Sequence, residues 1–296
     1  MRIVFIGSSQ SSKLLLKQSL RLKLNIVGIC TLKKSFNNDF VDLKKDFSKF
    51  NIPKIYSSNI NSNYSYKWIK NKKPDLIFCF GWSQILKKKI FSLSKIATIG
   101  FHPTELPKNR GRHPIIWSLA LGLSKTASTF FKIDNEFPDS GRIISQKIIK
   151  IEKNDVAGSL YNKIMKCSIK QLPKIIKNLK KKNFFLMKNK KIYNSWRKRK
   201  YIDGMIDWRM SAKDIYNLTR ALDKPYMNSH FYLGRKEIKV LKCKIVNYKN
   251  DKYNFNLEPG KILNKKINFF DVKCGEGVVR ILKTNKKLQL KNINYL

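Results

Sequence analysis

The first seven residues, MRIVFIG, form a short apolar run that ends in glycine. This pattern is typical of a strand that is buried on both faces of a parallel sheet. Segments with helical apolar spacing, such as residues 13–20 and 113–123, lie between this run and others like it. The other predicted strands are residues 24–31, 74–81, 95–101, 126–134 and 142–151. Strands that alternate with helices predict an α/β fold, here a Rossmann-like, doubly wound and mostly parallel sheet with helices on both faces.

The second part of the chain has a different pattern. Residues 155–182 carry apolar side chains at helical spacing, and Pro173 should kink or split that helix. After a polar linker comes another helix, for which Ser211 is the expected N-cap, with Asp214 three residues on. Short alternating runs predict strands at residues 231–234, 237–246, 259–263, 269–273, 277–283 and 287–290. We therefore predict a catalytic domain over residues 1–200 and a small all-β subdomain, an OB-like barrel, over residues 201–296.

The charge of the chain is strongly positive. Lysine and arginine total 63 against 19 aspartate and glutamate residues, which gives a net charge of +44. Such an excess is typical of proteins that bind nucleic acid or another anionic surface. The lysines are nevertheless spread over almost every segment together with asparagine and isoleucine, the residues that AT-rich codons supply. A functional field and a bias of genome composition both stay open as explanations.

The five cysteines show no paired spacing, so the sequence indicates neither a disulfide framework nor a zinc site. Reduced thiols suit the cytoplasm. No apolar run approaches the ~18 residues that span a bilayer, and the N-terminus lacks the features of a signal peptide. We expect a cytoplasmic protein without a membrane span and without a metal.

One predicted loop concentrates unusual residues. Residues 100–114 read GFHPTELPKNRGRHP and hold two of the three histidines and three of the nine prolines of the chain. His102 lies where a predicted strand ends, the place where ligands bind in open α/β sheets, and an imidazole is a natural proton acceptor near neutral pH. Asp134 and Asp139 follow the next predicted strand, so one of these carboxylates could orient the imidazole. Spacing alone does not separate such a pair from two unrelated loop residues.

Several segments in register resemble the folate-dependent formyltransferases, the family of methionyl-tRNA formyltransferase. The family signature is Asn-x-His-x-Ser-x-Leu-Pro-x-x-Arg-Gly, with Asp-x-Gly some thirty residues later. Here GFHPTELPKNRG and PDSG match it, while MRIVFIGSS resembles the first strand of the family and PDLIFCFGWSQIL the strand and turn before the active site. DGMIDWRMSAKDIYNLTRALDKPY resembles the entry to the C-terminal subdomain, although PYMNSHF departs from the usual PYPGAF.

Within the family the chain looks most like the sugar N-formyltransferases. The segment RGRHPIIW carries Arg112 and Trp117, which fit the sugar pattern, whereas the tRNA enzyme usually reads RGAAPI. The resemblance implies N10-formyltetrahydrofolate as formyl donor and the primary amine of a nucleotide-linked amino sugar as acceptor. Methionyl-tRNA formyltransferase is the alternative, and it would give the positive charge a role in binding RNA. A nucleic-acid-binding protein without enzymatic activity is a third hypothesis, but no base-stacking motif supports it.

By the same resemblance His102 takes the proton of the attacking amine, and Asp139 orients and stabilises the imidazole. The family has an asparagine two residues before the histidine, which donates to the developing oxyanion. This chain has Gly100 at that position. Three interpretations follow. Another donor replaces the amide, such as protonated His102, a water molecule or Asn109; or the chemistry has moved to a related one-carbon transfer; or the protein has no catalytic activity.

Other site residues are implied by position in the family pattern. Residues in the turn after the third strand, and one residue shortly before the aspartate, are expected to line the pterin slot. Arg112 is expected to bind the folate tail or the phosphates of the sugar. His113 is expected to be structural, and we assign no role to His230. A homodimer is common among sugar-modifying relatives. The expected pterin residues are Trp82, Ile85, Leu86 and Ile133, and the expected substrate contacts are Ser8, Ser9, Thr104, Lys108 and Asn109.

Overall fold

The computed structural model describes residues 1–35, 38–180, 194–246, 256–290 and 292–296. The chain forms two compact units. The first unit contains residues 1–114, 126–149 and 162–196, and the second contains residues 115–125, 150–161 and 197–296. The division into a catalytic domain over 1–200 and a subdomain over 201–296 remains a prediction.

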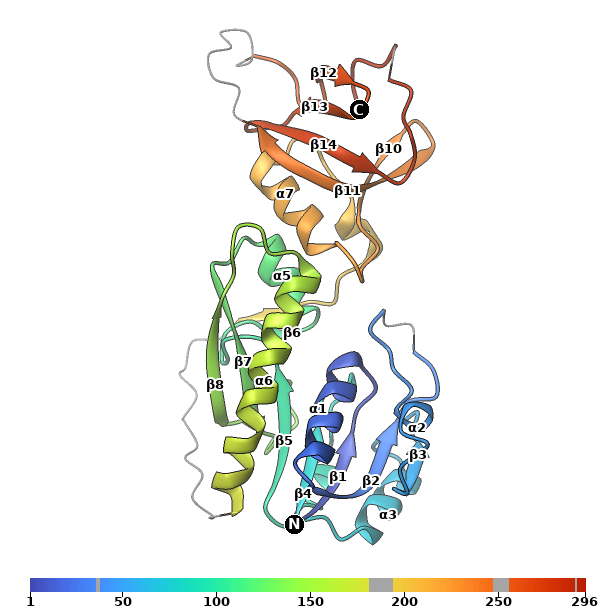
Figure 1. The fold of residues 1–296 in the computed structure, drawn as a ribbon, viewed down its shortest axis with the longest axis vertical. Coiled ribbons are helices and arrows are strands. Elements are labelled where there is room, and N and C mark those ends of the chain that lie inside the picture. The colour runs from blue at the N-terminus through green and yellow to red at the C-terminus, as the bar shows by residue number, and fades with distance from the viewer. Residues whose placement is uncertain (36–37, 181–193, 247–255, 291) are drawn as a thin grey trace. The chain divides into compact units, whose positions relative to one another are not determined.

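The first unit is built on a seven-stranded sheet with the strand order β3-β2-β1-β4-β5-β7-β8 (Figure 1). The strands from β3 to β5 pair in parallel, and β7 pairs with β5 in the antiparallel direction. The expected mostly parallel α/β fold is therefore confirmed. The strands are β1 Arg2–Ile6, β2 Asn25–Thr31, β3 Lys54–Tyr56, β4 Leu76–Cys79, β5 Ala97–His102, β7 Lys125–Lys132 and β8 Ile143–Lys150.

Helices connect these strands. Ser9 caps the first of them, because its side chain accepts a hydrogen bond from the backbone of Ser12. The long helix α6 continues through Pro173, so of the two predicted effects of this proline, a kink or a split, the split does not occur. The helices are α1 Gln10–Arg21, α2 Leu43–Asp46, α3 Asn63–Asn71, α4 Lys88–Phe91, α5 Pro114–Ala120 and α6 Ala157–Lys180.

The two faces of the sheet have different cores. Successive side chains of a strand point to opposite faces, so paired residues of neighbouring strands share a face. On one face phenylalanine rings pack together, with Phe80 contacting Phe5, Phe78 and Phe130 at centroid distances of 5.6, 5.0 and 5.5 Å. On the other face aliphatic side chains of β1 and β4 pack with Ile69 of α3 and Ile90 of α4. The catalytic candidates lie on this second face.

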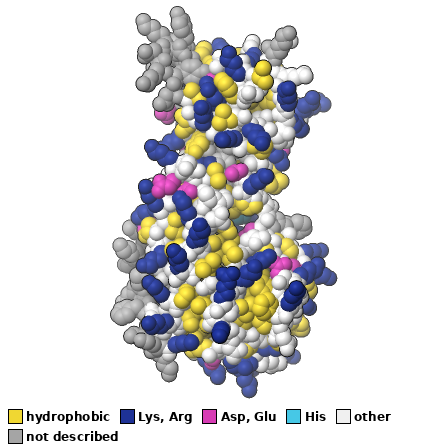
Figure 2. Space-filling view, viewed as in Figure 1, with side chains coloured by type: hydrophobic (Ala, Val, Ile, Leu, Met, Phe, Trp, Pro, Cys, Tyr) yellow, Lys and Arg dark blue, Asp and Glu magenta, His cyan; other side chains and the backbone are white. Residues whose placement is uncertain are grey.

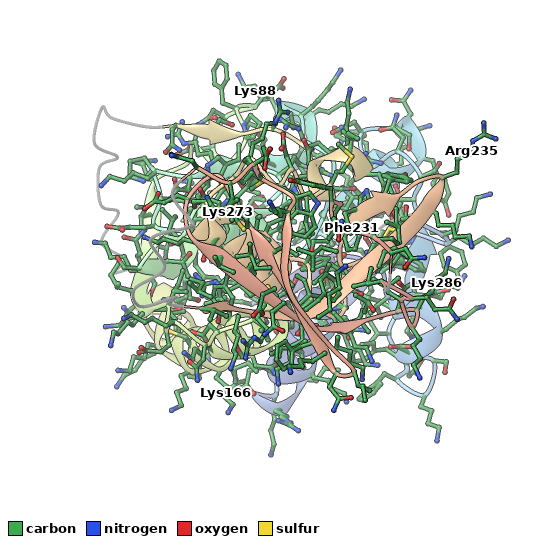
Figure 3. All side chains as sticks on the ribbon, turned by 90° about the horizontal axis from the view of Figure 1, so that it is seen from above. Lys88, Lys166, Phe231, Arg235, Lys273 and Lys286 are labelled. Carbon is green, nitrogen blue, oxygen red and sulfur yellow. The ribbon has the colours of Figure 1, made fainter. Side chains whose placement is uncertain are left out.

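The second unit holds a five-stranded antiparallel sheet with the order β10-β11-β14-β13-β12 and the helix α7 (Ala212–Ala221). Ser211 caps α7 by accepting from the backbone of Asp214, as predicted. Phe231 is buried and packs edge-on against Trp208 at 5.4 Å, while Arg235 projects from the turn after β10 (Figure 3). Residues 287–290 form no strand, contrary to the prediction. The strands are β10 Ser229–Leu233, β11 Lys236–Val246, β12 Ile262–Lys266, β13 Phe269–Lys273 and β14 Val278–Thr284.

His230 on β10 is buried without polar partners. It is 1% exposed, and neither ring nitrogen has a hydrogen-bond partner among the described residues. Its ring stacks on Tyr201 at 4.6 Å. Burial lowers the pKa of His230; nearby Glu237 opposes this shift and Lys239 adds to it. The folded protein therefore favours the neutral ring.

We expect the free energy of unfolding of the His230→Phe variant to fall less than that of wild type as the pH is lowered. In the unfolded chain this histidine gains a proton near its ordinary pKa of about 6.5, whereas the folded chain resists protonation, so the wild-type free energy of unfolding falls below that pH. Urea unfolding of both proteins between about pH 5 and about pH 8 tests this. The difference between their unfolding free energies should shift in favour of the variant as the pH falls. A constant difference would contradict the prediction.

Candidate active site

The site is built around the end of β5, where a row of paired residues crosses the sheet. Gly100 pairs with Cys79 of β4 on one side and with Phe131 of β7 on the other. His102 is two residues further along β5 and therefore lies on the same face. It is 5% exposed. The sheet fixes the backbone of all four residues.

Asp139 contacts His102, with 3.5 Å between Oδ1 of the carboxylate and Nδ1 of the imidazole. This is longer than a usual hydrogen bond, as catalytic contacts often are before substrate binds. The structure thus brings together the two residues expected to form the catalytic pair. Asp134, the other carboxylate in this part of the sequence, pairs instead with Arg142, at 3.1 Å from Oδ2 to Nε.

The route by which Asp139 reaches the histidine differs from the expected one. Because β7 is antiparallel to β5, Lys132 at its end pairs with Ile99, and Thr129 is the partner of His102. The end of β7 therefore points away from the histidine. The loop after β7 folds back to place Asp139, whose φ of +50° lies in the left-handed region. The loop conformation, and not a shared strand edge, makes the pair.

A second loop segment, residues 109–111, contacts both members of the pair. The backbone carbonyl of Asn109 lies 3.1 Å from Nε2 of His102. The backbone N–H of Gly111 donates to Oδ2 of Asp139 at 3.0 Å. Both ring nitrogens of His102 therefore face an acceptor, and the carboxylate is held by a donor on its other oxygen.

Cys79 is the thiol next to Gly100 in the sheet. Burial, together with the nearby charge of Asp139, raises the pKa of Cys79 to about 12. The thiol stays protonated at neutral pH and is not an activated nucleophile. All five cysteines are free.

Phe131 fills the space beside Gly100. A Cβ atom at position 100 would lie 2.5, 2.8 and 3.0 Å from three atoms of the Phe131 ring. The ring is 5% exposed and packs with Leu106 and Ile143. A side-chain amide at position 100 therefore needs a different arrangement of Phe131. Hydrocarbon occupies the place next to His102 where the family signature has its amide donor.

Three of the four residues expected to line the pterin slot share one apolar cluster. Leu86 is buried in it, and Trp82 and Ile133 pack against it. Trp82 Nε1 is buried without a hydrogen-bond partner among the described residues. Ile85 is 50% exposed and is not one of the cluster residues. An apolar wall with an unused N–H donor fits a flat, polar-edged ring such as a pterin.

The turn that carries Trp82 is fixed on both sides. Gln84 Oε1 accepts from the backbone of Ile60 at 3.0 Å, and Asn61 Nδ2 donates to the carbonyl of Ile85 at 2.9 Å. The backbone N–H of Lys88 donates to Glu136 on the loop that carries Asp139, at 2.7 Å. This hydrogen bond joins the start of α4 to the loop that carries Asp139.

Arg112 lies at the ends of β1 and β4. Its Nη1 donates to the carbonyl of Ser83 at 3.1 Å. Burial raises the pKa of Asp39, and the charge of Arg112 partly offsets this. The backbone of Ser8 accepts from Val41, two residues beyond Asp39. The guanidinium therefore lies close to the segment that follows β1.

The expected substrate contacts differ in their surroundings. The Ser9 hydroxyl is used by the cap of α1, and Ser8 is 6% exposed. Thr104 is fully buried, and its hydroxyl donates to the carbonyl of Lys108, whose side chain is exposed. These positions leave the hydroxyls of Ser9 and Thr104 engaged within the protein. The roles of all these residues remain predictions.

Trp117, which the sequence pattern linked to the sugar enzymes, belongs to the second unit. Its Nε1 donates to the carbonyl of Arg197 at 3.0 Å. The guanidinium groups of Arg197 and Arg199 lie 5.5 and 5.6 Å from its ring centroid. Both guanidinium groups are within the distance of a cation–π interaction with the indole.

Comparison with known proteins identifies the family. Residues 1–176 match the family described as formyl transferase, and residues 198–293 match the formyl transferase C-terminal domain. The chain belongs to the formyl transferase family. It is therefore an enzyme of the transferase class, and the expectation from the sequence is confirmed at this level.

Two curated relatives are similar to the chain. The chain is 36% identical over 247 residues to the bifunctional polymyxin resistance protein ArnA of Wigglesworthia glossinidia brevipalpis. This match covers 82% of the chain but only 36% of the length of that protein. The chain is 26% identical over 294 residues to a methionyl-tRNA formyltransferase of Caldanaerobacter subterraneus, covering 97% of the chain and 93% of the relative.

Solved structures share the fold. The N-formyltransferase of Helicobacter canadensis in complex with folinic acid and dTDP-3-aminofucose has a TM-score of 0.70 at 19% identity, covering 95% of this chain and 98% of that one. WlaRD, a sugar 3N-formyl transferase in the presence of dTDP and 5-N-formyl-THF, has a TM-score of 0.68 at 20% identity, covering 97% and 99%. The structural likeness supports the fold.

Two kinds of feature are absent from the residues that the structure describes. None of their helices combines the length and the apolar character that a membrane crossing requires. Within the same ranges no three His, Cys, Asp or Glu side chains are grouped so as to hold a metal ion. The cytoplasmic location and the homodimer remain predictions.

We expect Gly100→Ala to lower the free energy of unfolding by about 1–3 kcal/mol, because the new Cβ meets the buried ring of Phe131. Phe131→Leu should relieve this contact, so the double variant should be more stable than the sum of the single effects by at least about 0.5 kcal/mol. Chemical denaturation of the four proteins measures this coupling. Simple additivity of the two effects would show that the ring does not fill the position.

Proposed function

We propose that the protein transfers a formyl group from N10-formyltetrahydrofolate to the primary amine of a nucleotide-linked amino sugar. The observation that carries the proposal is the contact between His102 Nδ1 and Asp139 Oδ1, on the sheet face that also carries the apolar cluster with Trp82. An imidazole and a carboxylate in contact can remove a proton from an amine and stabilise the resulting cation. Membership of the formyl transferase family supports the type of group that is transferred.

In this mechanism the chain supplies binding and proton transfer. The folate donor supplies the activated formyl carbon. Trp82, Leu86 and Ile133 would hold the flat ring of the donor, with Trp82 Nε1 available to donate a hydrogen bond. His102 accepts the proton of the attacking amine, and Asp139 stabilises the imidazolium electrostatically. Residue 100 contributes no side-chain donor, so the oxyanion must be stabilised by another group, for which the imidazolium of His102 is the nearest candidate.

Two findings support a nucleotide sugar as the acceptor, and a third weakens the alternative. The curated methionyl-tRNA formyltransferase is 26% identical to this chain, below the 36% of the polymyxin resistance protein. The similarity to the solved sugar 3N-formyl transferase with dTDP and to the N-formyltransferase with dTDP-3-aminofucose extends over 99% and 98% of those chains. Arg112 places a guanidinium next to the segment after β1, where phosphates could bind it.

The positive charge by itself does not favour tRNA. Lysine and arginine side chains are scattered over the visible surfaces of both units in Figure 2, together with exposed hydrophobic residues. A nucleic-acid interface usually gathers basic side chains on one face or along one helix. Methionyl-tRNA remains the second candidate acceptor because the relative with that activity matches 97% of the chain.

His102→Ala should lower kcat/KM for formyl transfer by about 10²-fold or more, since the proton acceptor is lost. Asp139→Asn keeps an acceptor for the N–H of Gly111 but removes the charge, so it should cost less. The assay is formylation of a panel of nucleotide amino sugars, and of methionyl-tRNA, with the folate donor. His113→Asn, in the same segment, is the matched control, because asparagine tolerates the φ of +53° at that position. Transfer to methionyl-tRNA alone would overturn the sugar assignment.

Salt dependence separates the two acceptors in a second way. A protein that contacts 6–10 phosphates loses ~10³–10⁵ in affinity for nucleic acid between about 50 and about 200 mM salt. The few phosphates of a nucleotide sugar give a much weaker dependence, so we expect KM for the sugar to change less than about tenfold over the same range. Methionyl-tRNA would be favoured as the acceptor if the rate of its formylation fell steeply with rising salt and tRNA still bound tightly at the salt concentration of the cell.

A further inference from the structure

The segment that contacts both catalytic residues is held from far along the chain. Residues 109–111 contribute the carbonyl near Nε2 of His102 and the N–H on Asp139. β6 (Arg110–Gly111), inside this segment, pairs in parallel with β9 (Ser195–Trp196). Arg112 N–H donates to the carbonyl of Trp196 at 3.0 Å, on the far side of this short ladder. The ladder ties the segment to residues 195–196.

Asn194 completes the attachment. Its Oδ1 accepts from the backbone N–H of Asn109 at 2.8 Å, and its Nδ2 donates to Oδ1 of Asn109 at 3.0 Å. The carbonyl of Asn194 accepts from the N–H of Arg110 at 3.1 Å. Asn109 itself has a φ of +61°, in the left-handed region. The carboxamide of Asn194 thus binds two atoms of Asn109, which presents the carbonyl to His102.

The position of that carbonyl decides which protons His102 can carry. A neutral imidazole has one N–H, so it can donate either to the carbonyl of Asn109 or to the carboxylate of Asp139. The unprotonated nitrogen then faces the other oxygen, and no hydrogen bond forms between the two. The imidazolium satisfies both acceptors. When Nε2 donates to Asn109, the only nitrogen that can accept the proton of the amine is Nδ1, on the side of Asp139. The location of this segment therefore sets the orientation of the ring and the nitrogen at which it accepts a proton.

We propose that Asn194 is a positioning residue of the active site. Through Asn109 it holds the backbone carbonyl against His102 Nε2, and through the same segment it keeps the N–H of Gly111 on Asp139. It acts without touching the reacting atoms. Residue 194 lies more than 50 positions beyond Asp139 in the sequence, so no motif around His102 includes it.

The first test is NMR of the histidine ring in the full-length protein. A ring N–H that is hydrogen-bonded and buried exchanges slowly enough with water to give a downfield ¹H–¹⁵N correlation. The chain has only three histidines, and His102→Gln assigns the signal. We expect the Nε2 correlation of His102 in wild type and in Asn71→Ala, an exposed asparagine at the end of α3, and its loss in Asn194→Ala. An unchanged signal in Asn194→Ala, or no signal in wild type, would overturn the proposal.

The second test is kinetic and rests on the proposed function. Asn194→Ala should lower kcat by about tenfold and leave KM for the folate donor within about twofold, because the reacting groups are misplaced while the slot is intact. Asn194→Asp keeps the acceptor for Asn109 N–H and should recover part of the loss. Asn109→Gly keeps the carbonyl and the left-handed backbone, and its effect should be the smallest.

The two tests fail separately. If wild type formylates no amino sugar while the NMR result holds, the proposed function is wrong and the positioning role stands. If wild type is active and Asn194→Ala matches it in kcat and in the ring signal, the positioning role is wrong. Circular dichroism and thermal unfolding confirm that each variant is folded before either comparison.

Discussion

The antiparallel pairing of β7 with β5 determines the geometry of the active site. A parallel strand at this place would end beside His102 and deliver its loop directly to the histidine. The observed direction instead puts Phe131 opposite Gly100 and ends β7 near Ile99. The chain must then fold back to bring Asp139 to the ring, and the hydrogen bond from Gly111 holds it there. A single reversal of strand direction thus accounts for both the aromatic neighbour and the looped carboxylate.

Much of the fold could be predicted because it depends on local patterns. Apolar runs marked the strands of the first sheet, and the serine at position 211 marked the start of α7. β3 was missed because KIY is too short to show a period. Pro173 did not split α6, since burial of residues on both sides, such as Leu172 and Ile176, holds the helix together despite the lost hydrogen bond.

The site was predicted only as far as its motifs reach. Position after a strand pointed to His102, and the family pattern pointed to Asp139, but neither indicates Phe131 or Asn194. Phe131 becomes part of the site through strand register, which one sequence does not specify in advance. Asn194 becomes part of it through a two-residue ladder formed by segments 85 residues apart. Such contacts leave no periodic signal in the sequence. The family signature did indicate one unusual position, because it has an asparagine where this chain has Gly100. In the structure the ring of Phe131 fills the space beside that glycine.

The β6–β9 ladder also has a consequence for how the enzyme matures. A growing chain contains the histidine, the carboxylate and the whole first sheet well before residues 194–196 are synthesised. Contacts of such long sequence separation form late, because the intervening chain must first be ordered. The sheet can therefore be complete while the segment that contacts His102 and Asp139 is still unattached. Activity should be among the last properties that a newly made molecule acquires, and among the first to disappear when the ladder opens under mild denaturing conditions, before the central sheet unfolds.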